Sequence, residues 1–526
     1  MNYYLMNFLS WWYLRTAYFH KRTCDLLKVA YTLMAWHLHP FCLLLLYFIS
    51  ISLLGFIALV LFEHAKPGSS TSLGNFDLFF MSVSALTSSS LASVNMEDMS
   101  NSQFWVLIFL MFVGGEAFLS AVTLLFQCLD FSALVPRPEL PGVPRLPDTT
   151  DVENVGGAVT TTNVAMDDEG MTKLAMKCLA NVALGFCMSV NLLGSLMVFA
   201  YFKVIPSARR ILNQKGLNVV TFSIFTTVSS FANCGFFPNN ENMVVFREDS
   251  GLLWMVIGQI LVGNTLYPVC LTLVIWALMK CFPRKEHEYL WKKGHELGYS
   301  HLFPWRSTVY LTISAVGFTV VQLIMFGFLE WESVSGISFY RKFVAGLFQS
   351  VNARHAGEMA FDLSVFSPAL LVVYIVMMYL PPYVFLVPLS AVKTIKDNHN
   401  GSSKKKKKKK GVELIMQYLL LPQVAYLVVF VVLVCITERK QLRADPLNFN
   451  VLNIVFELSS AYGNVGLTTG YSCRRLQEIT DRPCRDSSVS FSGKWSVAGK
   501  IIILVVMFFG RVKKFTAGGK AWVTVM

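Results

Sequence analysis

Long apolar runs without charge alternate along this chain with short polar stretches. A helix needs about 20 residues to cross the hydrocarbon core of a bilayer. Six uncharged runs are long enough, at residues 40–62, 178–202, 251–279, 307–329, 363–392 and 414–436. A seventh run, 103–129, contains Glu116, and an eighth, 495–510, contains Lys500 and is followed by Arg511. The pattern predicts eight membrane-spanning helices.

Four further stretches lie between pairs of these runs and differ from them in composition. They are moderately apolar but rich in Ser, Thr, Asn and Gly, at residues 76–94, 217–237, 343–358 and 449–469. Irregular backbone is tolerated at membrane depth only where it is buried in protein or lines a water-filled path. We therefore predict a short helix that enters the membrane, followed by a non-helical segment that returns to the same side.

The four stretches can be superposed on one small residue each, namely Ser90, Gly235, Gly357 and Gly466. An aromatic residue precedes each anchor, at Phe80, Phe225, Phe348 and Phe456. The spacing is nine positions before Gly357 and ten before the other three anchors. A serine lies six or seven positions before each, at Ser84, Ser229, Ser350 and Ser460. The spacing predicts a unit of helix, re-entrant segment and helix, repeated four times.

The predicted fold class is thus an all-α integral membrane protein with four pseudo-repeats around one central pore. The repeats are assigned to residues 37–130, 172–282, 306–394 and 412–526. A cytoplasmic N-terminal segment (1–36), two cytoplasmic linkers (131–171 and 283–305) and a lysine-rich cytoplasmic loop (395–411) complete the chain.

Glycine at the turn of a re-entrant segment has a chemical reason. Carbonyl oxygens that replace the water shell of a cation must point at the pore axis, and glycine adopts the positive φ angles that this requires. The backbone just before each anchor, at Ser89, Cys234, Ala356 and Val465, is expected to contribute to the same filter. A single such glycine is usually a loop or packing residue, and small polar residues also pack helices together. Four small residues at matching positions, three glycines and one serine, favour a filter.

Composition and charge agree with a membrane protein. The chain is 54% hydrophobic and 15% charged, and its net charge is +13. Part of that charge is the tract 404–410, which we interpret as a solvated cytoplasmic loop or as a contact with anionic lipid, and nucleic acid is not expected as a partner. The positive-inside bias places both termini in the cytoplasm, although the acidic stretch 148–169 does not fit it.

Sequence features of other functional classes are missing. The nine histidines are dispersed, and there is no nucleotide-binding glycine loop or nucleophile motif, so neither an enzyme nor a cofactor is expected. A receptor or scaffold would not explain four re-entrant segments. Cys473 and Cys484 lie in a polar loop predicted to be external, where a disulfide and two free thiols are both compatible with the sequence.

The aligned segments resemble those of plant HKT transporters, part of the Trk/Ktr/HKT superfamily of cation transporters. The resemblance rests on VSSFANCGFFPNNENM, FQSVNARHAGE, YGNVGLTTGYSC, LVGNTLYP and MFFGRVKKF. It implies one filter residue per repeat, at Ser90, Gly235, Gly357 and Gly466, and transport of Na⁺ or of Na⁺ and K⁺ at the plasma membrane, with packing as a homodimer left open. In that family the Ser-Gly-Gly-Gly filter subtype is associated with Na⁺ selectivity. A Na⁺/K⁺ symporter or a K⁺-permeable transporter is the alternative.

Three further positions are candidates for a constriction of the pore. The resemblance implies that Arg511 forms an electrostatic barrier below the filter, while a position beside cytoplasmic lysines also fits a side chain that extends to the interface. Pro381 and Pro382 remove two helix donors and predict a break in the sixth span, where the family has an intramembrane gating loop. We expect the side chains of Arg354, His355 and Glu358 to orient the backbone of the third filter segment by hydrogen bonds, in preference to coordinating a cation. Glu116 is expected to be a structural residue beside packing glycines.

Overall fold

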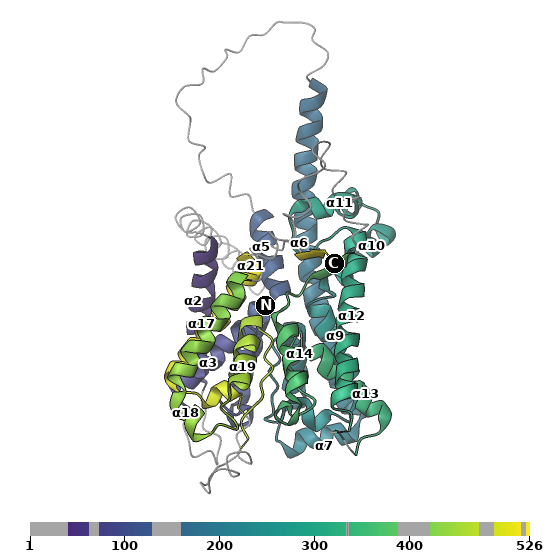
Figure 1. Cartoon of the computed structure of the whole chain (residues 1–526). Helices are drawn as coiled ribbons and strands as arrows, with labels where there is room; N and C mark the ends of the chain where they lie inside the picture. The colour runs from purple at the N-terminus through teal and green to yellow at the C-terminus, as the bar shows by residue number, and fades with distance from the viewer. Residues whose placement is uncertain are drawn as a thin grey trace, which may run out of the picture.

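The computed structural model describes residues 40–62, 73–128, 159–332, 334, 336–387, 421–472, 489–516 and 522–525. Within these residues the chain is mostly helical, and most of its long helices run roughly along the long axis of the molecule (Figure 1). The predictions for residues 1–36 and 395–411 and for Cys473 and Cys484 lie outside the described residues, as does most of the linker 131–171.

The first two repeats each contain a long outer helix, a short pore helix and a second helix broken in two. In repeat 1 these are α2 (Pro40–Leu61), α3 (Asn75–Leu86), and α4 (Asn101–Gly114) with α5 (Glu116–Cys128). In repeat 2 they are α6 (Val159–Val204), α8 (Val219–Phe231), and α9 (Ser250–Gly263) with α10 (Tyr267–Cys281). The short α7 (Pro206–Gln214) precedes α8, and α11 (Lys285–Lys293) follows α10.

The last two repeats follow the same plan. Repeat 3 contains α12 (Trp305–Leu329), the pore helix α13 (Phe339–Asn352) and α14 (Pro368–Tyr379). Repeat 4 contains α17 (Leu421–Thr437), the short α18 (Arg439–Ala444), the pore helix α19 (Val451–Gly463) and α21 (Val497–Thr516). Helices therefore occur at all eight predicted spans, and short helices at all four predicted re-entrant segments.

Membrane-spanning length is met by some of these helices alone and by others in pairs. Among the described residues, α2, α12 and the part of α6 from Gly170 are long and apolar enough to cross a bilayer, and the bent pairs α4–α5 (58°) and α9–α10 (82°) each meet the criterion together. Large apolar side chains such as Leu54, Ile324 and Phe328 are exposed on the outer helices, as lipid contact requires.

The sixth predicted span is not one continuous helix. Helix α14 ends at Tyr379, and Leu380 is extended, with φ −67° and ψ 137°, because a residue before proline disfavours the helical conformation. The chain then forms strand β1 (Val384–Val387), which pairs in parallel with β2 (Trp522–Val525) near the end of the chain. The predicted break at Pro381 and Pro382 is present, and the small sheet beyond it was not predicted.

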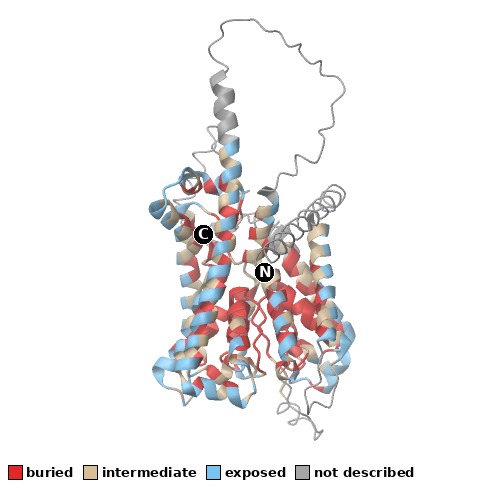
Figure 2. Ribbon diagram, turned by 180° about the vertical axis from the view of Figure 1, so that it is seen from behind, coloured by how far each residue is buried: buried red, intermediate tan, exposed pale blue. Residues whose placement is uncertain are grey.

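Packing between repeats closes them into a ring. Each pore helix contacts the second helix of the preceding repeat: α8 contacts α4, α13 contacts α9, and α19 contacts α14. The first pore helix, α3, contacts α21 from the last repeat. Buried residues accordingly gather along the middle of the molecule, around extended segments, whereas the outer helices are more exposed (Figure 2).

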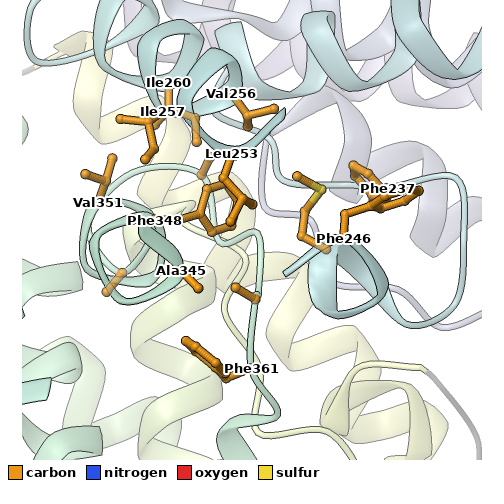
Figure 3. Close-up of a cluster of buried hydrophobic side chains, with 14 of the residues drawn as sticks. Phe237, Phe246, Leu253, Val256, Ile257, Ile260, Ala345, Phe348, Val351 and Phe361 are labelled. Atoms are coloured by element: carbon orange, nitrogen blue, oxygen red, sulfur yellow. The ribbon is translucent and has the colours of Figure 1, made fainter. Parts of the chain in front are cut away.

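A hydrophobic cluster joins repeats 2 and 3 beside the centre. Phe348 from α13 packs among Leu253, Ile257 and Ile260 from α9 (Figure 3). The same cluster includes Phe237, at the end of the second re-entrant segment, and Phe246 in the loop after it. These side chains are almost fully buried. Lipid tails are as apolar as these side chains, so close van der Waals packing, and not removal from water, holds α13 beside repeat 2.

Candidate functional site

The four pore helices end just before the four anchor residues. Their C-terminal caps are Thr87, Ala232, Ala353 and Asn464. The C-terminus of a helix carries roughly half a negative elementary charge, because its last carbonyl groups have no partner within the helix. Four such ends directed toward one region favour a cation there.

All four anchor residues have left-handed backbone conformations. The φ angle is +52° at Ser90, +89° at Gly235, +71° at Gly357 and +97° at Gly466. Serine in this conformation is strained by about 1–2 kcal/mol, which glycine avoids. Ser89 does not have positive φ, and Ser88 (+55°) corresponds to Asn233 (+52°) and Asn464 (+47°), which lie two residues before their anchors. The shared conformation therefore supports Ser90, and not its neighbour Ser89, as the counterpart of the three glycines.

The four anchors lie against one another in the order of the repeats. A Cβ atom added to Gly235 would lie 3.2 Å from Ser90 Oγ and 1.6 Å from the carbonyl oxygen of Ala356. A Cβ added to Gly357 would lie 2.3 Å from the carbonyl oxygen of Val465. One added to Gly466 would lie 2.4 Å from Ser90 Cβ. Glycine is thus required at these three positions by space as well as by φ.

Backbone oxygens of the predicted neighbouring residues surround the same point. The position of a Cβ on Gly466 is 3.1 Å from the carbonyl oxygens of both Ser89 and Cys234, which belong to repeats 1 and 2. Together with the Ala356 and Val465 oxygens, all four predicted neighbours therefore place a carbonyl group beside an anchor. Carbonyl oxygens in a ring are the ligands by which pore proteins replace the water shell of alkali cations.

Side-chain hydrogen bonds hold the non-helical returning segments against their pore helices. Ser229 Oγ accepts from the Gly235 amide (3.1 Å), and Ser460 Oγ accepts from the Gly466 amide (3.0 Å). In repeat 1, Ser84 Oγ accepts from the Leu91 amide, one residue beyond Ser90, at 2.8 Å. These bonds account for three of the four serines noted in the sequence.

In repeat 3 a different residue, and not the recurring serine Ser350, holds the returning segment. Ser350 Oγ donates to the Gly346 carbonyl within its own helix (2.8 Å), and Asn352 Oδ1 accepts from the Glu358 amide (3.0 Å) instead. Asn352 lies four residues after Phe348, just as Ser84 lies four residues after Phe80. The aromatic spacing, nine residues in this repeat instead of ten, was the signal that could have located Asn352.

Glycines on the second helices allow close contact with the pore helices in three repeats. A Cβ on Gly114, Gly263 or Gly510 would lie 1.9, 2.0 or 2.1 Å, respectively, from a carbonyl oxygen at the end of the neighbouring pore helix. Those oxygens belong to Leu86, Phe231 and Tyr462. Gly114 lies two residues before Glu116, so Glu116 does stand beside a glycine that packs helices together, as expected.

In repeat 3 an arginine side chain, and not a glycine contact, links the end of the pore helix to the break after the second helix. Arg354 Nη2 donates to the carbonyl oxygens of Pro381 (2.7 Å) and Pro382 (3.4 Å), and its guanidinium lies 4.5 Å from the centre of the Phe318 ring. Arg354 therefore connects the end of pore helix α13 to the break after α14. The expectation that Arg354 orients the filter backbone is wrong, because its hydrogen bonds go to the break after α14.

Arg511 is buried inside the ring of helices. The side chain is 2% exposed, and its Nη2 atom donates to the Gly114 carbonyl oxygen at the break between α4 and α5. It therefore does not extend to the surface as the interfacial interpretation requires.

An ion pair connects the loop after the pore helix of repeat 1 with the loops on either side of the pore helix of repeat 2. Lys215 Nζ lies 2.7 Å from Glu97 Oε1 and also contacts Glu241. Partial burial opposes the charge on Lys215, but hydrogen bonds to Glu241 and Glu97 outweigh burial and raise the pKa of this lysine. Within the described residues, no group of three or more His, Cys, Asp or Glu side chains could hold a metal ion.

Four helix–loop–helix repeats whose anchors meet at one point define the chain as a pore-loop membrane protein. Residues 162–518 match the TrkH family, described as cation transport protein. The chain is 45% identical over 477 residues to the sodium transporter HKT1 of Arabidopsis thaliana, covering 87% of this chain and 90% of the relative. The chain therefore belongs to the TrkH/HKT family of cation transporters, and it is a multi-pass membrane protein, not an enzyme.

Other relatives support the same assignment. The chain is 41% identical to the cation transporter HKT1;3 of Oryza sativa subsp. japonica, with 90% of both chains covered. A crystal structure of the potassium transporter TrkH from Vibrio parahaemolyticus superposes with a TM-score of 0.50 at 14% identity, covering 91% of this chain and 83% of that one. The structural match extends the common fold across all four repeats.

Proposed function

We propose that this cation transporter conducts Na⁺ in preference to K⁺ through the ring formed by Ser90, Gly235, Gly357 and Gly466. Ser90 carries the proposal, because it alone among the four anchors adds a Cβ and a hydroxyl to the ring, and it lies directly against Gly235 and Gly466. The extra atoms reduce the space left to a dehydrated ion, which disfavours K⁺ as the larger cation. The name of the Arabidopsis thaliana relative, sodium transporter HKT1, agrees with this preference.

Arg511 and the break at Pro381 and Pro382 are proposed to restrict the path beyond the filter. The Arg511 guanidinium is fully charged at neutral pH and is buried beside the first repeat, where it opposes an entering cation. The break interrupts the inner helix of repeat 3 close to the end of its pore helix. We place the protein in the plasma membrane with both termini in the cytoplasm.

Flux through purified protein tests the proposed function. Protein reconstituted into liposomes should release or take up Na⁺ faster than K⁺ under equal gradients, and protein-free liposomes provide the baseline. Comparable Na⁺ and K⁺ flux would favour the alternative of a Na⁺/K⁺ symporter or a K⁺-permeable transporter. Flux at the baseline for both ions would contradict transport by the isolated chain and favour a receptor or scaffold.

The proposed barrier is tested by Arg511→Gln. Removing the charge should increase the current, because a buried cationic group raises the energy of a cation beside it. A variant that reaches the surface in normal amounts and carries an unchanged current would contradict the barrier.

A further inference from the structure

A buried glutamate follows directly after the third filter anchor. Glu358 is 0% exposed. Its backbone amide donates to Asn352 Oδ1, in the bond that holds the non-helical returning segment of repeat 3 against pore helix α13. Its carboxyl group extends to the neighbouring repeat, where Oε1 lies 2.6 Å from Ser230 Oγ on pore helix α8. This contact joins the third filter strand to the second pore helix.

The hydrogen bonds of Ser230 require a count of hydrogens. Its Oγ atom lies 2.6 Å from Glu358 Oε1 and 2.7 Å from the Thr226 carbonyl oxygen. The carbonyl can only accept, and an ionised carboxylate can only accept, but the hydroxyl has a single hydrogen. Both contacts are satisfied if the carboxyl group is protonated: Glu358 then donates to Ser230, and Ser230 donates to Thr226.

The surroundings of the carboxyl group favour the same protonation state. Glu358 Oε2 has no hydrogen-bond partner among the described residues. A buried carboxylate is stable only with cationic or hydrogen-bonding partners, whereas a neutral acid leaves only a carbonyl-like oxygen unsatisfied. Glu457 Oε2 likewise has no partner among the described residues, but Glu457 and Glu438 each accept a hydrogen bond from a backbone amide, that of Ser492 (2.8 Å) or Ser496 (3.0 Å), which the Glu358 carboxyl group does not.

We propose that Glu358 is a protonated positioning residue, which donates a hydrogen bond to Ser230 and thereby holds Gly357 at its place in the filter. It acts through the backbone and does not coordinate the cation. The effect on ion selection rests on the proposed function, whereas the protonation state rests on the hydrogen bonds alone. A carboxylic acid that burial keeps neutral can serve as a lasting hydrogen-bond donor.

Two substitutions at Glu358 distinguish a hydrogen-bond donor from a negatively charged carboxylate. Glu358→Gln keeps the length and a donor but cannot ionise. Glu358→Asp keeps the acid but is one methylene too short to reach Ser230. We expect Glu358→Gln to retain the Na⁺/K⁺ permeability ratio of the parent. Glu358→Asp and Ser230→Ala should each change the ratio about fivefold, the factor that corresponds to one lost hydrogen bond.

The reverse pattern, with Glu358→Asp normal and Glu358→Gln impaired, would show that a carboxylate charge is needed and would overturn the proposal. Unchanged ratios in all three variants would also overturn it. Surface expression of every variant is measured alongside the current, so that loss of folding is not taken for loss of selectivity.

Infrared spectroscopy on purified protein tests the protonation state without ion flow. The difference spectrum between the parent and Glu358→Gln at neutral pH should contain the C=O band of a protonated carboxyl group. A carboxylate band in its place would contradict the proposal. Absence of current from the parent would refute the proposed function, and the infrared result would still decide whether Glu358 is protonated.

Discussion

Lys500 Nζ lies 2.7 Å from Asp77 Oδ1, although the two residues are 423 positions apart in the chain. Lys500 belongs to the last helix, α21, and Asp77 to the first turn of the first pore helix, α3. The pair therefore joins the two ends of the ring of repeats. It also explains why a lysine is tolerated in an otherwise apolar span, since its charge is compensated inside the protein.

Removing one partner of this pair should destabilise the ring. The lysine side chain is 11% exposed, so Lys500→Met leaves Asp77 without its counter-ion and should cost about 1–3 kcal/mol. Thermal melts followed by size-exclusion chromatography measure the loss. The double variant Asp77→Asn, Lys500→Met should lose less melting temperature than the two single variants lose together. Strictly additive losses would mean that the two residues do not interact.

The close contact of α9 with pore helix α8 predicts different outcomes for two glycines on one helix. Gly263→Ala places a Cβ about 2.0 Å from the Phe231 carbonyl oxygen and should strongly reduce the yield of folded protein. Gly258→Ala is the matched control, because a Cβ there meets nothing within 4 Å and alanine is the better helix former by roughly 1 kcal/mol. Equal yields for the two variants would contradict the packing.

The bonds from Arg354 to the break in repeat 3 should influence conduction. Arg354→Gln loses the charge and the pair of hydrogen bonds to Pro381 and Pro382, so the break is held less firmly and the current should change in size or kinetics. The control is Arg209→Gln, at an exposed position on α7. If Arg354→Gln conducts as the parent does at equal surface expression, the contact has no role in conduction.

The Lys215 pair predicts a dependence of stability on pH. The folded-state pKa of Lys215 is raised above 10.5, so its contribution is fully present below 10.5 and is lost as the pH rises through the higher folded-state value. Lys215→Met should therefore melt below the parent at neutral pH, and the difference should shrink in strongly alkaline buffer. A difference that stays constant over this range would indicate lost packing instead of a lost ion pair.

Much of the architecture could be predicted from the sequence because membrane helices have a strong signal. Apolar runs located the eight spans, and polar composition with an aromatic at fixed spacing located the four pore helices. Pro381 and Pro382 predicted the break because a proline ring removes a donor regardless of context.

Other features depend on contacts between repeats, which spacing along one chain does not encode. In repeat 3 the recurring serine, Ser350, bonds within its own helix, and Asn352 accepts from the Glu358 amide instead, because the helix turn on which a side chain lies decides which amide it caps. The partners of Lys500 and Arg511 lie in the first repeat, hundreds of residues away. The close approach of the four anchors likewise depends on how the repeats pack against one another.

The central claim is that Ser90 sets the preference for Na⁺, and reversal potentials in a heterologous cell test it most directly. The parent is compared with Ser90→Gly and with Ser88→Gly, a control that relieves a similar left-handed serine (φ +55°) two residues away. We predict that Ser90→Gly markedly increases K⁺ permeation relative to Na⁺, while Ser88→Gly leaves the ratio close to that of the parent. An unchanged Na⁺/K⁺ ratio in Ser90→Gly would contradict the claim.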